Sequence, residues 1–136
     1  MPNGPDRAQF WKEFLVERCD YPAPERLRAQ LAEAVFSDFC DCGCNSFAVE
    51  VPVGVAPLAN ARRNPPEGSG AIYTADFEMG DGRTLEIILF AGDSGNLDYV
   101  EVDCCANSYP VPDHISVEGE PFRRWEAMRL LPDERT

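Results

Sequence analysis

The sequence predicts an α+β fold in which two N-terminal helices pack on one face of an antiparallel sheet of four or five strands arranged as a β-meander. A short helix is expected near the C-terminus. Apolar residues recur at helical spacing only in the first part of the chain, and alternating runs separated by turn residues follow it. Helices and strands do not alternate, which argues against a doubly wound nucleotide-binding fold. The length of 136 residues suits a single domain spanning residues 1–136.

Two helices are expected before the first long strand. Residues 6–19 place four large apolar side chains on one stripe, namely Phe10, Trp11, Phe14 and Leu15. Pro24 can begin a second helix, whose apolar face holds Leu27, Leu31, Ala34 and Val35. Residues 34–39 could extend this helix or form a short strand paired with 46–52. We favour the strand, because the intervening Cys, Gly and Asn residues suit a hairpin connection.

Four further segments read as strands, because apolar residues alternate or run together between turn residues: 46–53, 71–79, 85–90 and 97–105. Gly80-Asp81-Gly82 and residues 92–96 are the expected turns of the meander. Residues 54–70 are rich in Pro, Gly, Asn and Arg and are expected to form a long flexible loop. Residues 122–131 are expected to form the short final helix, packed through Trp125 and Leu130.

The charge balance restricts the classes of partner. The chain has 24 acidic and 12 basic residues and a formal net charge of -12. Such a chain repels nucleic-acid phosphates and anionic membranes, and it favours a basic protein partner. No apolar run approaches the roughly 20 residues of a membrane helix, and the first residues lack a signal-peptide pattern. We therefore expect a cytoplasmic protein; the oligomeric state is left open.

The most unusual motif is a turn with three cysteines at every second position, Cys40, Cys42 and Cys44. Three thiolates could supply ligands to a zinc ion, with a fourth from Cys104, Cys105, His114, a carboxylate or water. The spacing departs from the C-x2-C spacing of common structural zinc sites. The same turn could instead hold a disulfide or reduced thiols without a ligand. The sequence leaves these three alternatives open.

Two other groups of residues are candidates for chemistry. Cys104 and Cys105 are adjacent on an expected strand, so one should be buried and the other exposed. Six carboxylates lie on expected neighbouring strands: Asp76, Glu78, Glu86, Asp98, Glu101 and Asp103. If several share the solvent face, they form a negative patch that a partner could bind. No catalytic set or cofactor-binding motif is assembled in the sequence.

The run from Leu85 to Val102, a strand followed by a Gly/Asp turn and a Leu-x-x-Val-Glu-Val strand, resembles a pattern in small uncharacterised bacterial proteins. Some of those proteins are similar to immunity proteins of toxin–immunity systems. Some also resemble this chain at Cys42-Gly43-Cys44 and the strand that follows it. The resemblance covers roughly residues 25–112 and implies a β-meander. It carries over no catalytic residue, and Cys104 and Cys105 depart from the pattern.

Three functional hypotheses follow from the sequence. The first is a non-enzymatic, immunity-like binding protein that presents an acidic sheet face or loop to a basic partner. The second is a small zinc-binding or redox-sensing domain built on Cys40, Cys42 and Cys44. The third is an enzyme, which would require a concave pocket holding a thiol or an acid with a shifted pKa. The sequence does not decide whether the chain is an enzyme, and it favours the first hypothesis.

Overall fold

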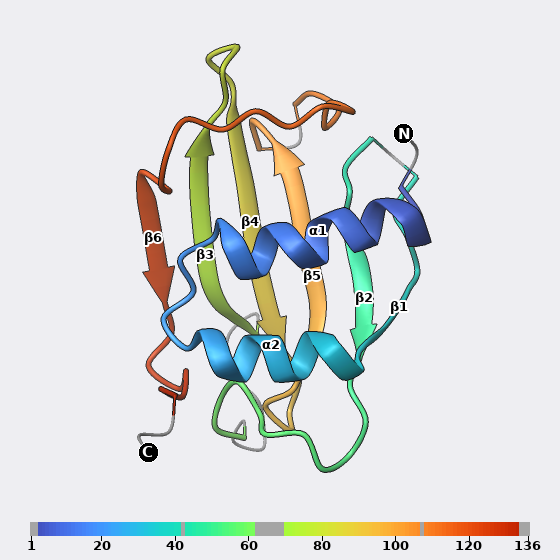
Figure 1. Ribbon diagram of the computed structural model, residues 1–136, viewed down its shortest axis with the longest axis vertical. Helices are drawn as coiled ribbons and strands as arrows, with labels where there is room; N and C mark the ends of the chain where they lie inside the picture. Colours follow the sequence, from blue (N-terminus) through green and yellow to red (C-terminus); the bar gives the residue numbers. More distant parts are fainter. Residues whose placement is uncertain (1–2, 42, 62–69, 107, 134–136) are drawn as a thin grey trace.

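The computed structural model describes residues 3–41, 43–61, 70–106 and 108–133. Its helices are α1, Pro5–Glu17, and α2, Pro24–Glu33. The strands are β1 Val35–Ser37, β2 Phe47–Glu50, β3 Ala71–Glu78, β4 Thr84–Ala91, β5 Leu97–Cys104 and β6 Arg123–Glu126. All neighbouring strands are antiparallel, in the order β1-β2-β5-β4-β3-β6 (Figure 1). The α+β class is therefore confirmed, with six strands among these residues.

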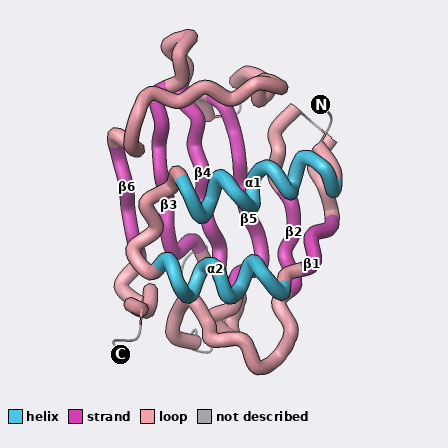
Figure 2. The backbone as a smooth tube through the Cα atoms, in the orientation of Figure 1, coloured by secondary structure: helices cyan, strands magenta, loops and turns pink. Residues whose placement is uncertain are grey.

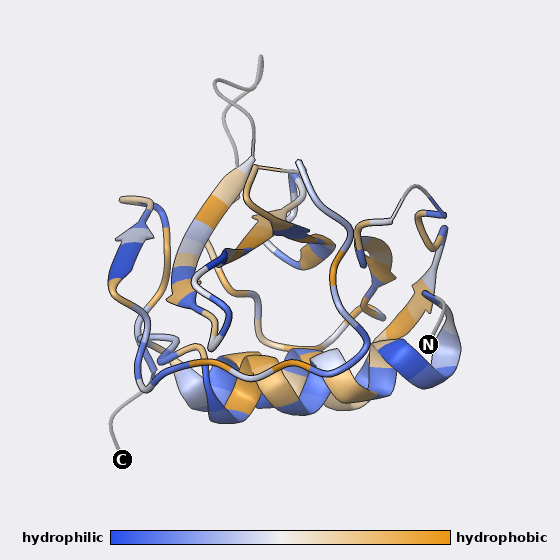
Figure 3. Cartoon of the chain, turned by 90° about the horizontal axis from the view of Figure 1, so that it is seen from above, coloured by the Kyte–Doolittle hydropathy of each residue, from blue (hydrophilic) through white to orange (hydrophobic). Residues whose placement is uncertain are grey.

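The two helices lie across the same face of the sheet (Figures 2 and 3). Burial alternates along β4: Leu85, Ile87 and Leu89 are fully buried, and the residues between them are half-buried. The three buried residues therefore lie on the face that the helices cover. The core lies between this face and the helices, with Leu15 and Leu31 among its members. Within residues 3–41, 43–61, 70–106 and 108–133, no helix lies on the opposite face of the sheet (Figure 3).

The predicted meander is formed by β3, β4 and β5, which follow one another in sequence and in space. Strand β2 adds to β5 rather than to β3, so the connection from β2 to β3 passes from one side of the meander to the other. Of the loop expected at 54–70, residues 62–69 lie outside the described residues. Within the described part, Leu58 and Ala59 are buried and bond to the turn between β4 and β5 through Gly95.

The first hairpin confirms the preferred alternative for residues 34–39. Val35 to Ser37 form β1, which pairs with Glu50 to Ala48 of β2. The connection is longer than a tight turn, because β1 ends at Ser37 and β2 begins at Phe47. Gly43 takes a positive φ of 103° within it.

The C-terminal segment corrects the expectation of a short helix. Arg123–Glu126 is a strand, β6, paired with β3 in a register that joins Asp76 to Arg123. The backbone N–H groups of Phe122 and Ala127 donate to the carbonyls of Asp76 and Ile72. This pairing supplies hydrogen-bond partners to the backbone groups along the edge of β3. A helix over these residues would leave that edge unpaired, and so short a helix is only marginally stable. Trp125, expected in a core, is 49% exposed.

Helix α1 is attached to the cysteine turn by a buried polar cluster. Asn45 is buried, and its side-chain oxygen accepts hydrogen bonds from Arg7 Nε at 2.9 Å and Trp11 Nε1 at 3.0 Å. The Arg7 guanidinium also donates to the carbonyls of Pro112 and Asp113. Each buried donor of this cluster thus has an acceptor, as buried polar groups require. The cluster joins the first helix, the turn before β2 and the segment after β5.

Candidate functional site

A group of carboxylates gathers on the sheet face that the helices leave uncovered. The register places Asp76 of β3 opposite Glu86 of β4, and Glu86 opposite Asp103 of β5. Glu101 lies two residues before Asp103 on β5 and therefore on the same face. We call these four residues, Asp76, Glu86, Glu101 and Asp103, the acidic face. The expectation that several carboxylates share one face is confirmed.

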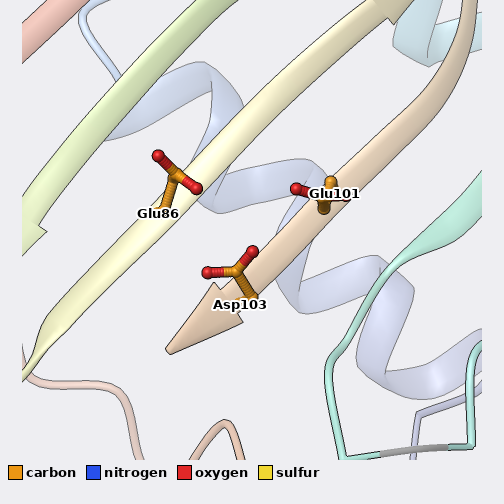
Figure 4. A group of neighbouring side chains, drawn as sticks. All are labelled: Glu86, Glu101 and Asp103. Carbon is orange, nitrogen blue, oxygen red and sulfur yellow. The ribbon is translucent and has the colours of Figure 1, made fainter. Parts of the chain in front are cut away.

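Three members of the acidic face form a compact set. One carboxylate oxygen from each of Glu86, Glu101 and Asp103 lies within 4.8 Å of the other two. Figure 4 shows these three side chains on neighbouring strands with their carboxyl groups close together. A hollow of about 410 Å³ opens beside them and is also lined by Cys44, Ser46, Tyr99 and Ala106. Among the described residues, no lysine, arginine or histidine lines this hollow.

Two of the carboxylates are almost fully removed from solvent. Asp76 is 8% exposed and Asp103 is 6% exposed. Asp76 Oδ2 lies 3.8 Å from Arg123 Nη1, but the Arg123 side chain is 74% exposed, so this ion pair is weak. Asp76 Oδ1 is buried and has no hydrogen-bond partner among the described residues. Burial of this much negative charge is costly unless a proton or a cation compensates it.

The electrostatic consequence is a carboxyl that titrates near neutral pH. Burial, followed by the neighbouring charges of Asp103 and Asp76, raises the pKa of Glu86 to about 7. Burial, followed by the charge of Asp103, also raises the pKa of Glu101. An acid with a shifted pKa beside a hollow is the feature that the enzyme hypothesis requires. The same arrangement can accept a proton, a metal cation or a basic side chain.

We predict that Glu86→Gln removes part of the pH dependence of stability. The pKa of Glu86 is about 7 in the folded protein against an ordinary 4.5. The folded state therefore keeps a proton that the unfolded chain releases, and the free energy of unfolding falls as the pH rises between these values. Relative to Glu86→Gln, the wild type should lose about 1–2 kcal/mol across this window, after allowance for solvent screening.

Urea unfolding between pH 5 and pH 8 in the presence of EDTA measures this difference. Glu120→Gln is the matched control, because Glu120 is exposed and lies outside the acidic face. Its stability curve should run parallel to that of the wild type. If the free energy of unfolding of Glu86→Gln shows the same pH dependence as that of the wild type, Glu86 does not hold the proton.

The structure describes two of the three cysteines of the turn, Cys40 and Cys44. Cys40 is disulfide-bonded, the Cys44 side chain is buried, and Cys42 lies outside the described residues. A sulfur in a disulfide is not available as a thiolate ligand. The zinc site at Cys40, Cys42 and Cys44 therefore stays a prediction for the reduced chain. His114 is exposed and lines a separate hollow of about 360 Å³ with Met79, Gly80 and Asp81 among its walls.

Cys104 and Cys105 do not simply point to opposite faces. Cys104 is fully buried and Cys105 is half-buried, yet the two thiols are joined by a hydrogen bond. Strand β5 ends at Cys104, and Cys105 adopts a positive φ of 52°, which turns the chain. Alternation holds only inside a strand, so it does not apply to this pair.

Sequence reasoning missed the uncharged walls of the hollow. Ser46 immediately precedes β2. Its hydroxyl accepts a hydrogen bond from the backbone N–H of Val102 at 3.0 Å. Tyr99 shares the face of Glu101 by strand alternation, which was the available signal. Asp98 and Glu78 do not line the hollow.

None of the described helices is long and apolar enough to cross a membrane. No family model, curated protein or solved structure matches this chain.

Proposed function

We propose that this chain is a non-enzymatic binding protein whose acidic face receives a basic protein partner, as in the immunity-like proteins that its sequence resembles. The observation that carries the proposal is the set of carboxylates of Glu86, Glu101 and Asp103, which lie within 4.8 Å of one another on the uncovered sheet face. They lie in a chain whose net charge is -12. Such a surface attracts a basic partner over long range and speeds association.

The hollow beside the carboxylates suits an arginine or lysine side chain from the partner. A guanidinium can form two parallel hydrogen bonds with a carboxylate, and such bonds are among the strongest in protein interfaces. The proton held by Glu86 would be displaced by this cation, because its pKa of about 7 reflects burial and neighbouring negative charge. Partner binding is therefore expected to release a proton near neutral pH.

An exposed tryptophan next to the acidic face supports a protein as the partner. Trp125 is 49% exposed. The register places Trp125 opposite Thr74, two residues before Asp76 and on the same face of the sheet. Exposed tryptophan is enriched among the residues that contribute most to protein interfaces. We place this interaction in the cytoplasm, in keeping with the unbridged thiols of Cys19, Cys104 and Cys105, although Cys40 is disulfide-bonded.

The proposal is tested with two triple variants. The face variant carries Glu86→Gln, Glu101→Gln and Asp103→Asn. The control variant carries three substitutions at exposed sites outside the acidic face, namely Glu33→Gln, Glu118→Gln and Glu120→Gln. Each variant replaces three carboxyl groups by amides. Because Glu86 holds a proton near neutral pH, the control variant removes at least as much negative charge as the face variant, so a larger loss of binding in the face variant cannot come from total charge.

Proteins retained by wild-type and control chains on an affinity column, but not by the face variant, are candidate partners. For a purified partner, we expect the face variant to bind at least about tenfold more weakly than the control. Wild-type affinity should also fall between about 50 mM and 300 mM NaCl. Equal binding by all three chains, or no retained protein with the wild type, would reject the proposal.

A second candidate is acid–base catalysis at the same hollow, favoured by the pKa of about 7 at Glu86. Two adjacent carboxyls can serve as acid and base in glycoside hydrolysis. Its test is turnover of a panel of p-nitrophenyl glycosides by the wild type and by Glu86→Gln. Hydrolysis by the wild type alone would support an enzyme, and no turnover by either chain would reject this candidate.

A further inference from the structure

We propose, beyond the proposed function and independently of it, that the outer edge of β6 binds a second copy of this chain. The two β6 strands would pair antiparallel around a two-fold axis. β6 is the last strand in the sheet order, and among the described residues no strand lies beyond it (Figure 1). An edge strand presents unpaired backbone N–H and C=O groups, which a further strand can pair with.

The outer edge of β6 is open to such pairing. All four residues of the strand are exposed. The pairing with β3 ends with a hydrogen bond from Ala127 N to Ile72 O, so alternation directs the backbone groups of every second residue before Ala127 toward β3. The N–H and C=O groups of Arg124 and Glu126 therefore point outward, away from the sheet.

The charges along β6 are self-complementary in one register. A two-fold axis perpendicular to the sheet keeps each side chain on its own face, so residues that lie opposite must be an even number of positions apart. When Arg124 lies opposite Glu126 of the second copy, the two exchange backbone hydrogen bonds and form an ion pair, which the symmetry repeats. The neighbouring registers place Arg124 or Glu126 opposite itself, so like charges disfavour them.

Exposed apolar side chains gather at the same edge. Phe122, Trp125 and Met128 are 55%, 49% and 103% exposed, and they are three of the six exposed large hydrophobic residues in the described chain. In the register that joins the opposite charges, Trp125 lies opposite its own copy, at a position where the Cα atoms are only about 4.5 Å apart. Phe122 and Met128 flank β6, and the same register brings Phe122 toward Met128 of the second copy. One arrangement thus covers all three side chains.

Arg124 keeps its present partner in this arrangement. Its Nη1 atom lies 3.0 Å from Asp20 Oδ2, but its side chain is still 43% exposed, and a guanidinium has five N–H donors. At the other end of the sheet, β1 is three residues long and carries no charged residue that could select a register. The edge of β6 is therefore the edge that suits a second copy.

The pairing would join two sheets into one and place both acidic faces on the same side of it. It buries a narrow strip between two chains that each carry a net charge of -12. We therefore expect a weak dimer, with a dissociation constant of roughly 0.1–1 mM in about 150 mM NaCl. At the low micromolar concentrations of unfolding experiments, the chain would remain a monomer.

Sedimentation equilibrium of the full-length chain between about 20 µM and 2 mM tests this pairing. The apparent mass of the wild type should rise from that of one chain toward that of two. Arg124→Glu and Glu126→Arg should each weaken self-association at least about tenfold, because each places like charges opposite one another. Glu33→Arg is the matched control, since it changes the charge as Glu126→Arg does but lies at the exposed end of α2. It should dimerise as the wild type does.

An equimolar mixture of Arg124→Glu and Glu126→Arg is the decisive sample. In the mixed pair each introduced charge meets its opposite, so the mixture should associate at least as strongly as the wild type, which also shows that both variants are folded. A mixture that associates no better than either variant alone, or a wild type that stays a monomer up to about 2 mM, would overturn the inference. The face variant should dimerise no more weakly than the wild type, so a failure of this pairing is distinct from a failure of the proposed function.

Discussion

Replacing Trp11 by alanine is expected to lower the free energy of unfolding by about 3–5 kcal/mol. Trp11 is fully buried, and its ring packs edge-on against Phe10 and Phe14 with centroid distances of 4.9 and 5.3 Å. Its indole N–H donates to the Asn45 side chain at 3.0 Å. The substitution removes the largest fully buried side chain and leaves a cavity between α1 and the sheet, which the rigid strands cannot close.

Urea unfolding followed by circular dichroism measures this loss, because the signal does not depend on the removed indole. Trp125→Ala is the matched control, since the same side chain is 49% exposed on β6. We expect it to cost no more than about 1 kcal/mol. Equal losses in the two variants would mean that Trp11 does not fill the core.

The elements that the sequence predicted correctly are those whose pattern is local. The stripe of Phe10, Trp11, Phe14 and Leu15 predicted α1, because each of these positions follows from helical spacing alone. The β6 strand could not be predicted in this way. Arg123 to Glu126 is short and exposed along its whole length, and it becomes a strand because β3 offers a free edge. A partner far along the chain decides its structure.

The candidate site was predictable only in part, for a similar reason. Alternation showed that Glu101 and Asp103 share a face of one strand. It could not show that Glu86 pairs with Asp103, because the register depends on the turn between the strands. Alternation does exclude Asp98, which falls on the opposite face from Glu101, and Asp98 does not line the hollow. The resemblance to immunity-like proteins stays a prediction, as does zinc binding at the cysteine turn.

Replacing Gly95 by alanine is expected to lower the free energy of unfolding by about 2–5 kcal/mol. Gly95 lies in the turn between β4 and β5 with a φ of +92°, a region that costs an alanine energy by itself. An added Cβ would also lie 2.0 Å from the carbonyl oxygen of Ala59 and 3.2 Å from Pro57 Cβ. The backbone of residues 57–59 would have to move, because a main-chain oxygen cannot rotate away as a side chain can.

That movement would break the contact that holds the connection between β2 and β3 against the meander. The carbonyl of Gly95 accepts hydrogen bonds from Leu58 N and Ala59 N at 2.9 and 3.2 Å, and both of those residues are fully buried. Losing them would release buried Leu58 as well as two backbone bonds. The expected loss therefore reaches beyond the turn, and thermal or urea unfolding should detect it as a single large shift.

Gly82→Ala separates the clash from the backbone strain. Gly82 also has a positive φ, +84°, in the turn between β3 and β4, but an added Cβ there meets nothing within 4 Å. It should cost only the strain, about 1–2 kcal/mol. The excess loss in Gly95→Ala then measures the contact with Ala59. If the two variants lose the same free energy, residues 57–59 do not rest on the turn, and the path of the chain from β2 to β3 must be drawn differently.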